Sequence, residues 1–183
     1  MAFAHSSVIV NTGATLDTRA RDQLAFPFLS RPQVMTAYVR FVWLAGDITN
    51  DLFVLQVGNN IPANPRFVLD ITGGNFRVIH INATGSNVSS TTSAAALAYG
   101  DTVEMRGTLL ATGSVQVGVS RNGAAEVAGS PSGALLLPEK WATVLLMVNS
   151  SGTAVVNFCA YRNIEIVAGI RTMQEMRARA GIT

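Results

Sequence analysis

The stretch from residue 34 to residue 44, VMTAYVRFVWL, alternates between the two faces of an extended chain. One face is apolar throughout: Met35, Ala37, Val39, Phe41 and Trp43. The opposite face begins polar and ends apolar: Thr36, Tyr38, Arg40, Val42 and Leu44. A period of two, rich in β-branched and aromatic residues, is typical of a half-buried β-strand. Because so long a strand needs partners on both edges and a second layer over its apolar face, we predict a central strand of a β-sandwich.

The rest of the chain supplies the strands that this one needs. Short apolar runs are separated by turn residues, and two turns, Thr72-Gly73-Gly74 and Arg121-Asn122-Gly123, are typical of tight hairpins. The region 103–127 is predicted to form an antiparallel meander. Residues 83–96 carry no charge and fit either a weak edge strand near Val88 or a loop. The pattern predicts an all-β fold, an antiparallel two-sheet β-sandwich or jelly roll of roughly ten to twelve strands.

The end of the chain carries a short predicted helix over about 171–180. Thr172 and Glu175 have the spacing of a capping box, in which the hydroxyl and the carboxylate satisfy free backbone N–H groups at the helix start. Three apolar residues are then expected to face the sandwich: Ile170, Met173 and Met176. Gly181 is expected to end the helix.

The chain is predicted to form a single β-sandwich domain over residues 23–183, with residues 1–22 as an N-terminal arm or edge strand. Its length is sufficient for one sizeable core. Arms of this kind often pair with neighbouring subunits, although frayed termini are common. Phe3, Val8 and Val10 are therefore the expected assembly contacts of this segment.

The composition is apolar and weakly charged. Hydrophobic residues make up 49% and charged residues 13% of the chain, against about 25% charged residues in average soluble proteins. Mean hydropathy is +0.33. The most apolar run, residues 141–148, is far shorter than the roughly 20 residues that cross a bilayer, so we expect a buried, central strand there and no membrane partner. Either other subunits cover much of the surface, or the chain is an ordinary β protein rich in small residues.

Charge and cysteine content exclude further classes of partner. The net charge is +2, and Lys140 is the lone lysine, so no basic cluster exists for a nucleic-acid partner. Cys159 is the lone cysteine; it lies in an apolar strand pattern and is expected to be a buried, inert thiol. The first ten residues lack the basic region and long apolar core of a secretory signal, so the chain is expected to be made in a cytoplasm.

Three stretches carry a resemblance to a known family. They are residues 24–28 (LAFPF) before the long strand, Tyr99-Gly100-Asp101 before residues 103–106, and residues 162–166 (RNIEI) before the short helix. Over roughly residues 24–180 the chain resembles the concanavalin A-like, laminin-G-like jelly-roll domains. More narrowly, it is similar to versions found in virion proteins of tailed bacteriophages.

The resemblance bears on metal binding and catalysis. Relatives that bind sugars through calcium cluster acidic and Asn ligands on loops, and Asp47, Asn50 and Asp51 share one loop that could supply such oxygens. Such residues are also frequent in plain turns, so they are weak metal candidates, and no cofactor is expected. Glycosidases of this fold carry an E-x-D-x-x-E segment, which this sequence lacks. Glu104 and Glu126 lie on different predicted strands, and we expect no enzyme activity.

Two functions fit these expectations. The first is a structural protein of a phage virion, a head decoration, minor capsid or tail component. It would bind the major capsid or tail protein, act as a homo-oligomer and reside in the virion. The alternative is a lectin-like module that binds a host surface glycan on the polar face of the long strand, through Tyr38 and Arg40 with Arg106 as a neighbour. The plain interpretation of those residues is a solvated sheet face.

Overall fold

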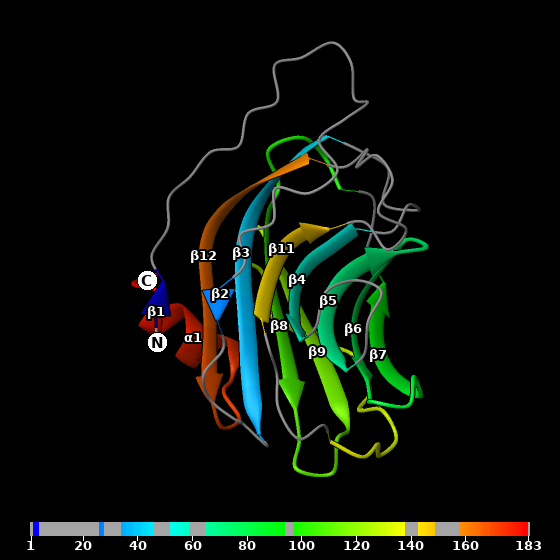
Figure 1. Ribbon diagram of the computed structural model, residues 1–183. Coiled ribbons are helices and arrows are strands. Elements are labelled where there is room, and N and C mark those ends of the chain that lie inside the picture. The colour runs from blue at the N-terminus through cyan, green and yellow to red at the C-terminus, as the bar shows by residue number, and fades with distance from the viewer. Residues whose placement is uncertain are drawn as a thin grey trace.

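The computed structural model describes residues 2–3, 26–27, 34–45, 52–58, 65–93, 97–137, 143–148 and 158–182 (Figure 1). Sheet A contains, in spatial order, β1 (Ala2–Phe3), β12 (Phe158–Ala168), β3 (Met35–Ala45), β8 (Thr102–Leu109), β9 (Val115–Arg121) and β10 (Val127–Ala128). Sheet B contains β2 (Phe26–Pro27), β11 (Thr143–Val148), β4 (Leu52–Gly58), β5 (Arg66–Thr72), β6 (Asn75–Ile81) and β7 (Asn87–Ser93). A short helix, α1 (Met173–Arg179), follows β12.

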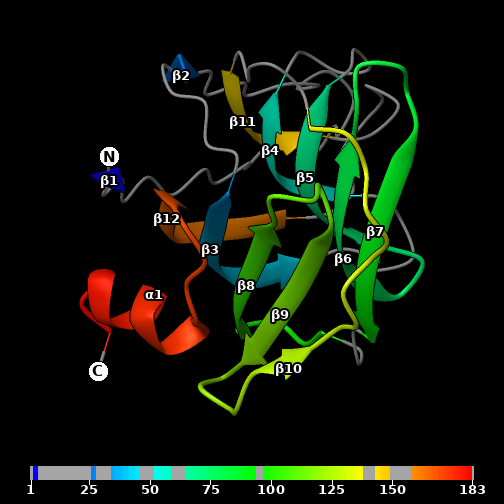
Figure 2. The ribbon, with the colours of Figure 1, turned by 90° about the horizontal axis from the view of Figure 1, so that it is seen from below.

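The two sheets form the predicted β-sandwich. Neighbouring strands pair antiparallel in both sheets, and the sheets lie face to face as two layers (Figure 2). The long strand β3 lies between β12 and β8, which confirms its central position. Its predicted apolar face is buried in the core between the sheets: Met35, Ala37, Val39, Phe41 and Trp43. Burial of this face in the core contributes to the hydrophobic stabilisation of the fold.

The connections follow the turn chemistry of the sequence. Thr72 pairs with Asn75 across the two glycines, which gives the expected β5–β6 hairpin. Strands β8 and β9 pair along their length, and the turn after Arg121 leads to the short β10, as expected for the meander. The segment near Val88 is the edge strand β7 rather than a loop, because each of its residues pairs with β6.

The short strands at the sheet edges agree with their sequences. Pro27 lies in β2, an edge strand of sheet B, which is where a strand tolerates a residue without an N–H donor. The apolar strand β11, expected to be central, lies between β2 and β4 and is therefore one strand from the edge. Phe3 lies in β1 and pairs with Ile164 of β12 at an edge of sheet A, whereas Val8 and Val10 are outside the described residues.

The C-terminal helix begins as the capping box predicts. The Glu175 N–H donates to Thr172 Oγ1 at 3.2 Å, and the Thr172 N–H donates to Glu175 Oε2 at 2.7 Å. Met173 and Met176 are buried against Tyr38 on the outer face of sheet A. Ile170, expected beside them, is exposed, because it precedes the helix and does not share its periodic face. Within the described residues, no helix is long and apolar enough to cross a membrane.

Candidate functional site

The face expected to bind a ligand lies on the outer side of sheet A. Tyr38 pairs directly with Arg106 of β8, and Arg40 pairs with Glu104, so the predicted neighbours do lie together. The Tyr38 side chain, however, is fully buried, because α1 packs Met173 and Met176 over it. A sugar needs an accessible aromatic ring to stack on. The expectation that Tyr38 is an exposed platform is therefore wrong.

Glu104 is the centre of a polar network, here called the Glu104 network, that joins α1 to three strands. Its carboxylate accepts from the Tyr38 hydroxyl at 2.6 Å and from Arg177 Nη2 of α1 at 2.6 Å. The same Arg177 nitrogen also donates to Ser120 Oγ of β9 at 2.6 Å. The residues of this network are largely withdrawn from solvent, which strengthens their hydrogen bonds. The network therefore fixes the position of the helix on the sheet.

The electrostatics of the Glu104 network are set by opposing effects. Burial would raise the pKa of Glu104, but hydrogen bonds from Arg177 and Tyr38 outweigh burial and hold that pKa below its ordinary value. Burial, assisted by the Glu104 contact, raises the pKa of the Tyr38 hydroxyl. Glu104 is accordingly a carboxylate and Tyr38 a neutral donor at neutral pH, as the observed hydrogen bonds require.

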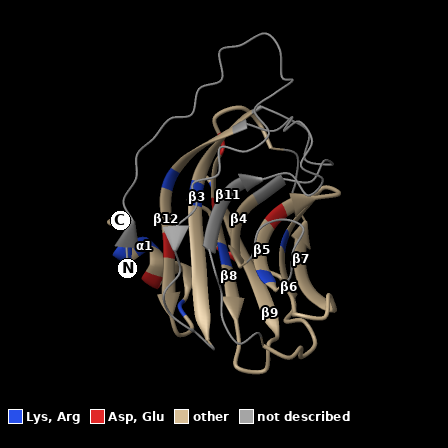
Figure 3. Ribbon diagram, viewed as in Figure 1, with Lys and Arg blue, Asp and Glu red and all other residues tan. Residues whose placement is uncertain are grey.

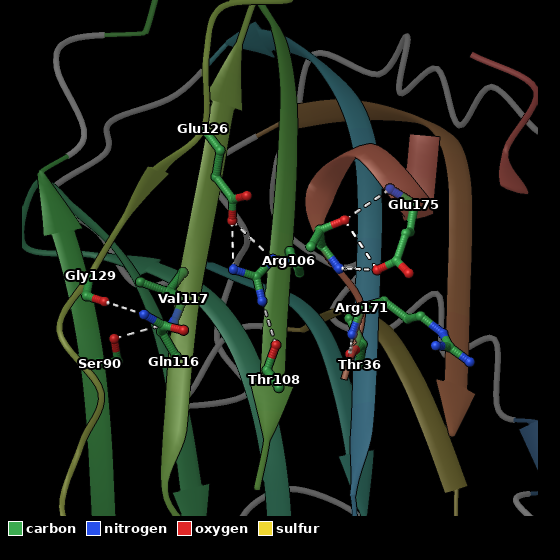
Figure 4. A network of polar contacts seen from close by, with 11 residues as sticks. Thr36, Ser90, Arg106, Thr108, Gln116, Val117, Glu126, Gly129, Arg171 and Glu175 are labelled. Carbon is green, nitrogen blue, oxygen red and sulfur yellow. Dashed lines mark hydrogen bonds and ion pairs between the residues drawn. The ribbon is translucent and has the colours of Figure 1, made fainter. Parts of the chain in front are cut away.

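Arg106, on the same face of sheet A, forms an ion pair with Glu126, which lies between β9 and β10. Its Nη2 lies 2.6 Å from Glu126 Oε1, and its Nη1 donates to Thr108 Oγ1 at 2.5 Å (Figure 4). Glu126 crosses β9 at Gly118, where an added Cβ would lie 1.7 Å from Glu126 Oε1. Arg106 is consequently buried and paired, and it does not present an open guanidinium to a ligand.

Charged groups gather where α1 meets sheet A. Figure 3 shows charged residues of both signs on α1 and β12. A further ion pair joins Arg179 of α1 to Glu165 of β12 at 2.9 Å. Arg40 is partly exposed beside these pairs. The outer face of sheet A is thus a docking surface for the chain's own helix.

The metal and histidine candidates give no site in the described part of the chain. Asp47, Asn50 and Asp51 lie outside the described residues, and among those described no group of three or more His, Cys, Asp or Glu could hold a metal ion. His80 is buried, with Nδ1 2.8 Å from the Gly113 carbonyl oxygen. Burial lowers its pKa in spite of that hydrogen bond, so the ring is neutral and structural.

An accessible aromatic side chain occurs instead at one end of the sandwich. Tyr99 is 82% exposed at the tip of a turn closed by the hydrogen bond from the Asp101 N–H to the Ala98 carbonyl, 3.1 Å. Gly100 has a φ of 90°, which suits the third position of a type II turn. Backbone bonds of 2.8 Å from Gly100 to Trp43 and from Trp43 to Asp101 hold the turn against β3. The ring is therefore presented on a fixed support.

Polar groups are organised around the same turn by Asp101. Its carboxylate accepts from the Ala98 N–H at 2.6 Å, from Asn122 Nδ2 at 2.8 Å and from Arg121 Nη2 at 2.5 Å. These contacts, the Ala98 bond foremost, hold the pKa of Asp101 below its ordinary value. Tyr99, Asp101, Arg121 and Asn122 are here called the Tyr99 corner. It brings together two turns that are distant in sequence.

The sequence contained both halves of the Tyr99 corner without indicating their proximity. In the sequence, Tyr99-Gly100-Asp101 marks the family resemblance and Arg121-Asn122-Gly123 predicts a hairpin turn. An aromatic residue directly before the turn residues Gly100 and Asp101 was the available signal, because turns lie at the surface. The contact between the turns follows from the β8–β9 register, in which Val103 lies opposite Arg121.

Comparison with known proteins identifies structural neighbours but no sequence relative. No protein-family model and no curated protein sequence matches the chain. The binding domain of botulinum neurotoxin serotype D aligns with a TM-score of 0.63 and 11% identity over 87% of this chain and 40% of that one. The receptor-binding domain of botulinum neurotoxin type G aligns with a TM-score of 0.56 and 10% identity over 81% and 38% of the two chains.

A carbohydrate-binding domain matches over most of both chains. The CBM40 domain of the Ruminococcus gnavus IT-sialidase, bound to α2,3-sialyllactose, aligns with a TM-score of 0.54 and 15% identity over 82% of this chain and 84% of that one. The chain thus spans about two fifths of the toxin binding domains but most of the CBM40 domain. At these identities the likeness establishes the β-sandwich fold, and the neighbours are carbohydrate-binding and receptor-binding domains.

Proposed function

We propose that the protein is a non-enzymatic carbohydrate-binding module. The observation that carries the proposal is the alignment over 82% of this chain and 84% of the CBM40 domain whose structure contains sialyllactose. The toxin neighbours are also binding domains by name. A fold alone does not define a ligand. The likeness therefore supports the class of function, and the identity of the sugar has to be inferred from the binding site.

From the sequence, a virion protein is the first expectation and a lectin-like module the second, with the glycan on Tyr38, Arg40 and Arg106. The neighbours favour the module, while α1 and Glu126 occupy the face that was to bind the glycan. The proposal therefore keeps the ligand class and moves its site away from the outer face of sheet A.

The proposal includes no catalytic step. Glycoside hydrolysis uses two carboxyl groups on either side of the scissile bond. Glu104 is engaged by Arg177 and Tyr38, and Glu126 by Arg106, so each has a structural role in holding a surface segment on sheet A.

A glycan array with the full-length protein tests the proposal. We expect binding to a subset of immobilised glycans, reversed by free sugar, with the glycan recovered intact by chromatography. Absence of binding to every glycan on the array would reject the module, and release of sugar fragments would reject its non-enzymatic character.

A structural role in a virion is the second candidate function. Its support is the low charge, 13% of residues, together with exposed aliphatic side chains such as Leu136 and Val127. In this role the protein would reside in the particle as a homo-oligomer bound to the major capsid or tail protein, where repeated weak contacts gain by multivalency. Purified protein mixed with particles that lack it should co-sediment with them, and recovery in the supernatant alone would exclude this role.

A further inference from the structure

We propose that the Tyr99 corner is a binding site for a neutral hexopyranose unit, which stacks on the Tyr99 ring. This inference rests on the proposed function and names the site and the sugar class. The apolar C–H face of a pyranose complements the face of an aromatic ring, and Tyr adds a hydroxyl at the rim. At 82% exposure the Tyr99 ring has the accessible surface that this stacking requires.

The support beneath the ring is already ordered. Its turn is closed by the Ala98–Asp101 hydrogen bond and is joined to β3 by two backbone bonds of 2.8 Å at Trp43. The Asp101 carboxylate ties the turn to the β9–β10 turn through Asn122. A ligand that binds here has little backbone to order, so more of the interaction energy appears as affinity.

Hydrogen-bonding groups for sugar hydroxyls lie on the neighbouring turn. The Arg121 side chain is 33% exposed, and its contact with Asp101 uses Nη2. A guanidinium carries five N–H donors, so the donors that do not contact Asp101 remain for hydroxyl oxygens of a bound sugar. Asn122 is exposed, at a φ of 52°, and its backbone carbonyl and second amide hydrogen add one acceptor and one donor.

The charge of the corner favours a neutral sugar. The ionised Asp101 carboxylate lies 2.5 Å from Arg121 Nη2 and neutralises it. An acidic sugar would have to compete with Asp101 for that guanidinium and would approach a second carboxylate. Binding is therefore expected to depend on ring stacking and neutral hydrogen bonds, and to change little with salt.

The test uses the full chain with three neutral disaccharides, lactose, maltose and cellobiose, and with 3′-sialyllactose as the acidic probe. We expect at least one neutral probe to bind, and its affinity to fall about tenfold or more in Tyr99→Ala, as loss of one stacked aromatic contact implies. Tyr99→Phe keeps the ring and should remain within about threefold of the unmodified protein. Leu136→Ala is the matched control, since Leu136 is 81% exposed in a segment that contacts the opposite end of the sandwich at Thr112.

The outcomes separate this site from the function itself. If glycans bind but Tyr99→Ala binds them as tightly as the unmodified protein, the site is wrong and the module stands. If 3′-sialyllactose alone binds through Tyr99, the assignment to a neutral sugar is wrong. If no glycan binds at all, both proposals are rejected. Amide chemical shifts provide a second readout, because the bound sugar should perturb Gly100 and Asn122 and leave the buried Tyr38 unchanged.

Discussion

Arg177 of α1 and Glu104 of β8 form a bidentate ion pair, with Arg177 Nε 3.0 Å and Nη2 2.6 Å from the Glu104 oxygens. The two residues are 73 positions apart in the chain. Charge-assisted pairs with two parallel N–H···O bonds are stronger than single neutral hydrogen bonds. This pair therefore links the helix to sheet A at a carboxylate that also accepts from the hydroxyl of Tyr38, which the helix buries.

The first prediction concerns removal of that pair from the helix side. Arg177→Ala should lower the free energy of unfolding by about 2 kcal/mol, because it leaves the buried Glu104 carboxylate without its cation. Arg179→Ala is the control on the same helix: its side chain is 45% exposed, against 24% for Arg177, so about 0.5 kcal/mol or less is expected. Urea unfolding measures both. Equal losses in the two variants would contradict the role given to the Glu104 network.

The second prediction is a pH dependence with a defined sign. Because the folded pKa of Glu104 lies below its ordinary value, its contribution to stability is present above the unfolded pKa and is lost as the pH falls through the folded pKa. Glu104→Gln lacks this titration. The stability difference between the unmodified protein and Glu104→Gln should therefore shrink on going from about pH 7 to about pH 3. A difference that stays constant across this range would exclude Glu104 as the responsible group.

The fold was predictable because its determinants are local. In β3 the alternation of Met35, Ala37 and Val39 with Thr36, Tyr38 and Arg40 defines a strand and its buried face. The capping box at Thr172 and Glu175 likewise needs only four consecutive residues. Such short-range signals predict the strands and the helix. The number and length of the predicted strands then indicate a β-sandwich.

The ligand face was not predictable, because its determinants are long-range. A tyrosine between Thr36 and Arg40 on a strand has the sequence of a solvated face, and the packing of Met173 and Met176 of α1 buries it. The helix pattern indicated that an apolar side would meet the sandwich, and the outer face of the long strand could be covered either by that helix or by another subunit; the packing on Tyr38 shows that it is the helix. The Tyr99 corner depends in the same way on a contact between residues 101 and 121.

The third prediction concerns the close approach of the Glu126 carboxylate to Gly118 of β9. Gly118→Ala places a Cβ where the Glu126 carboxylate lies, so the ion pair with Arg106 should be displaced and the free energy of unfolding should fall by about 1 to 2 kcal/mol. In a Glu126→Ala background the same substitution should cost less, because the remaining close atom, Arg106 Nη2 at 2.9 Å from the added Cβ, ends a side chain that Glu126 no longer holds. A double-mutant cycle in urea measures this coupling.

Gly133→Ala is the control for the cycle, because a Cβ at Gly133 meets no atom within 4 Å. It should change the stability little in either background. Purely additive losses for Gly118→Ala and Glu126→Ala would show that the close approach at β9 does not couple the two residues.

The fourth prediction concerns the thiol of Cys159. Burial raises the pKa of Cys159 to about 12, and the side chain lies in the core between the sheets. Since the thiolate is the reactive form, the native protein should resist a thiol-reactive disulfide reagent, and its labelling rate should rise steeply with urea. A Ser89→Cys variant, which places a second thiol at an exposed position of β7, should react at once at that position alone. Rapid labelling of Cys159 in the folded protein would mean that β12 opens far more readily than a central partner of β3 should.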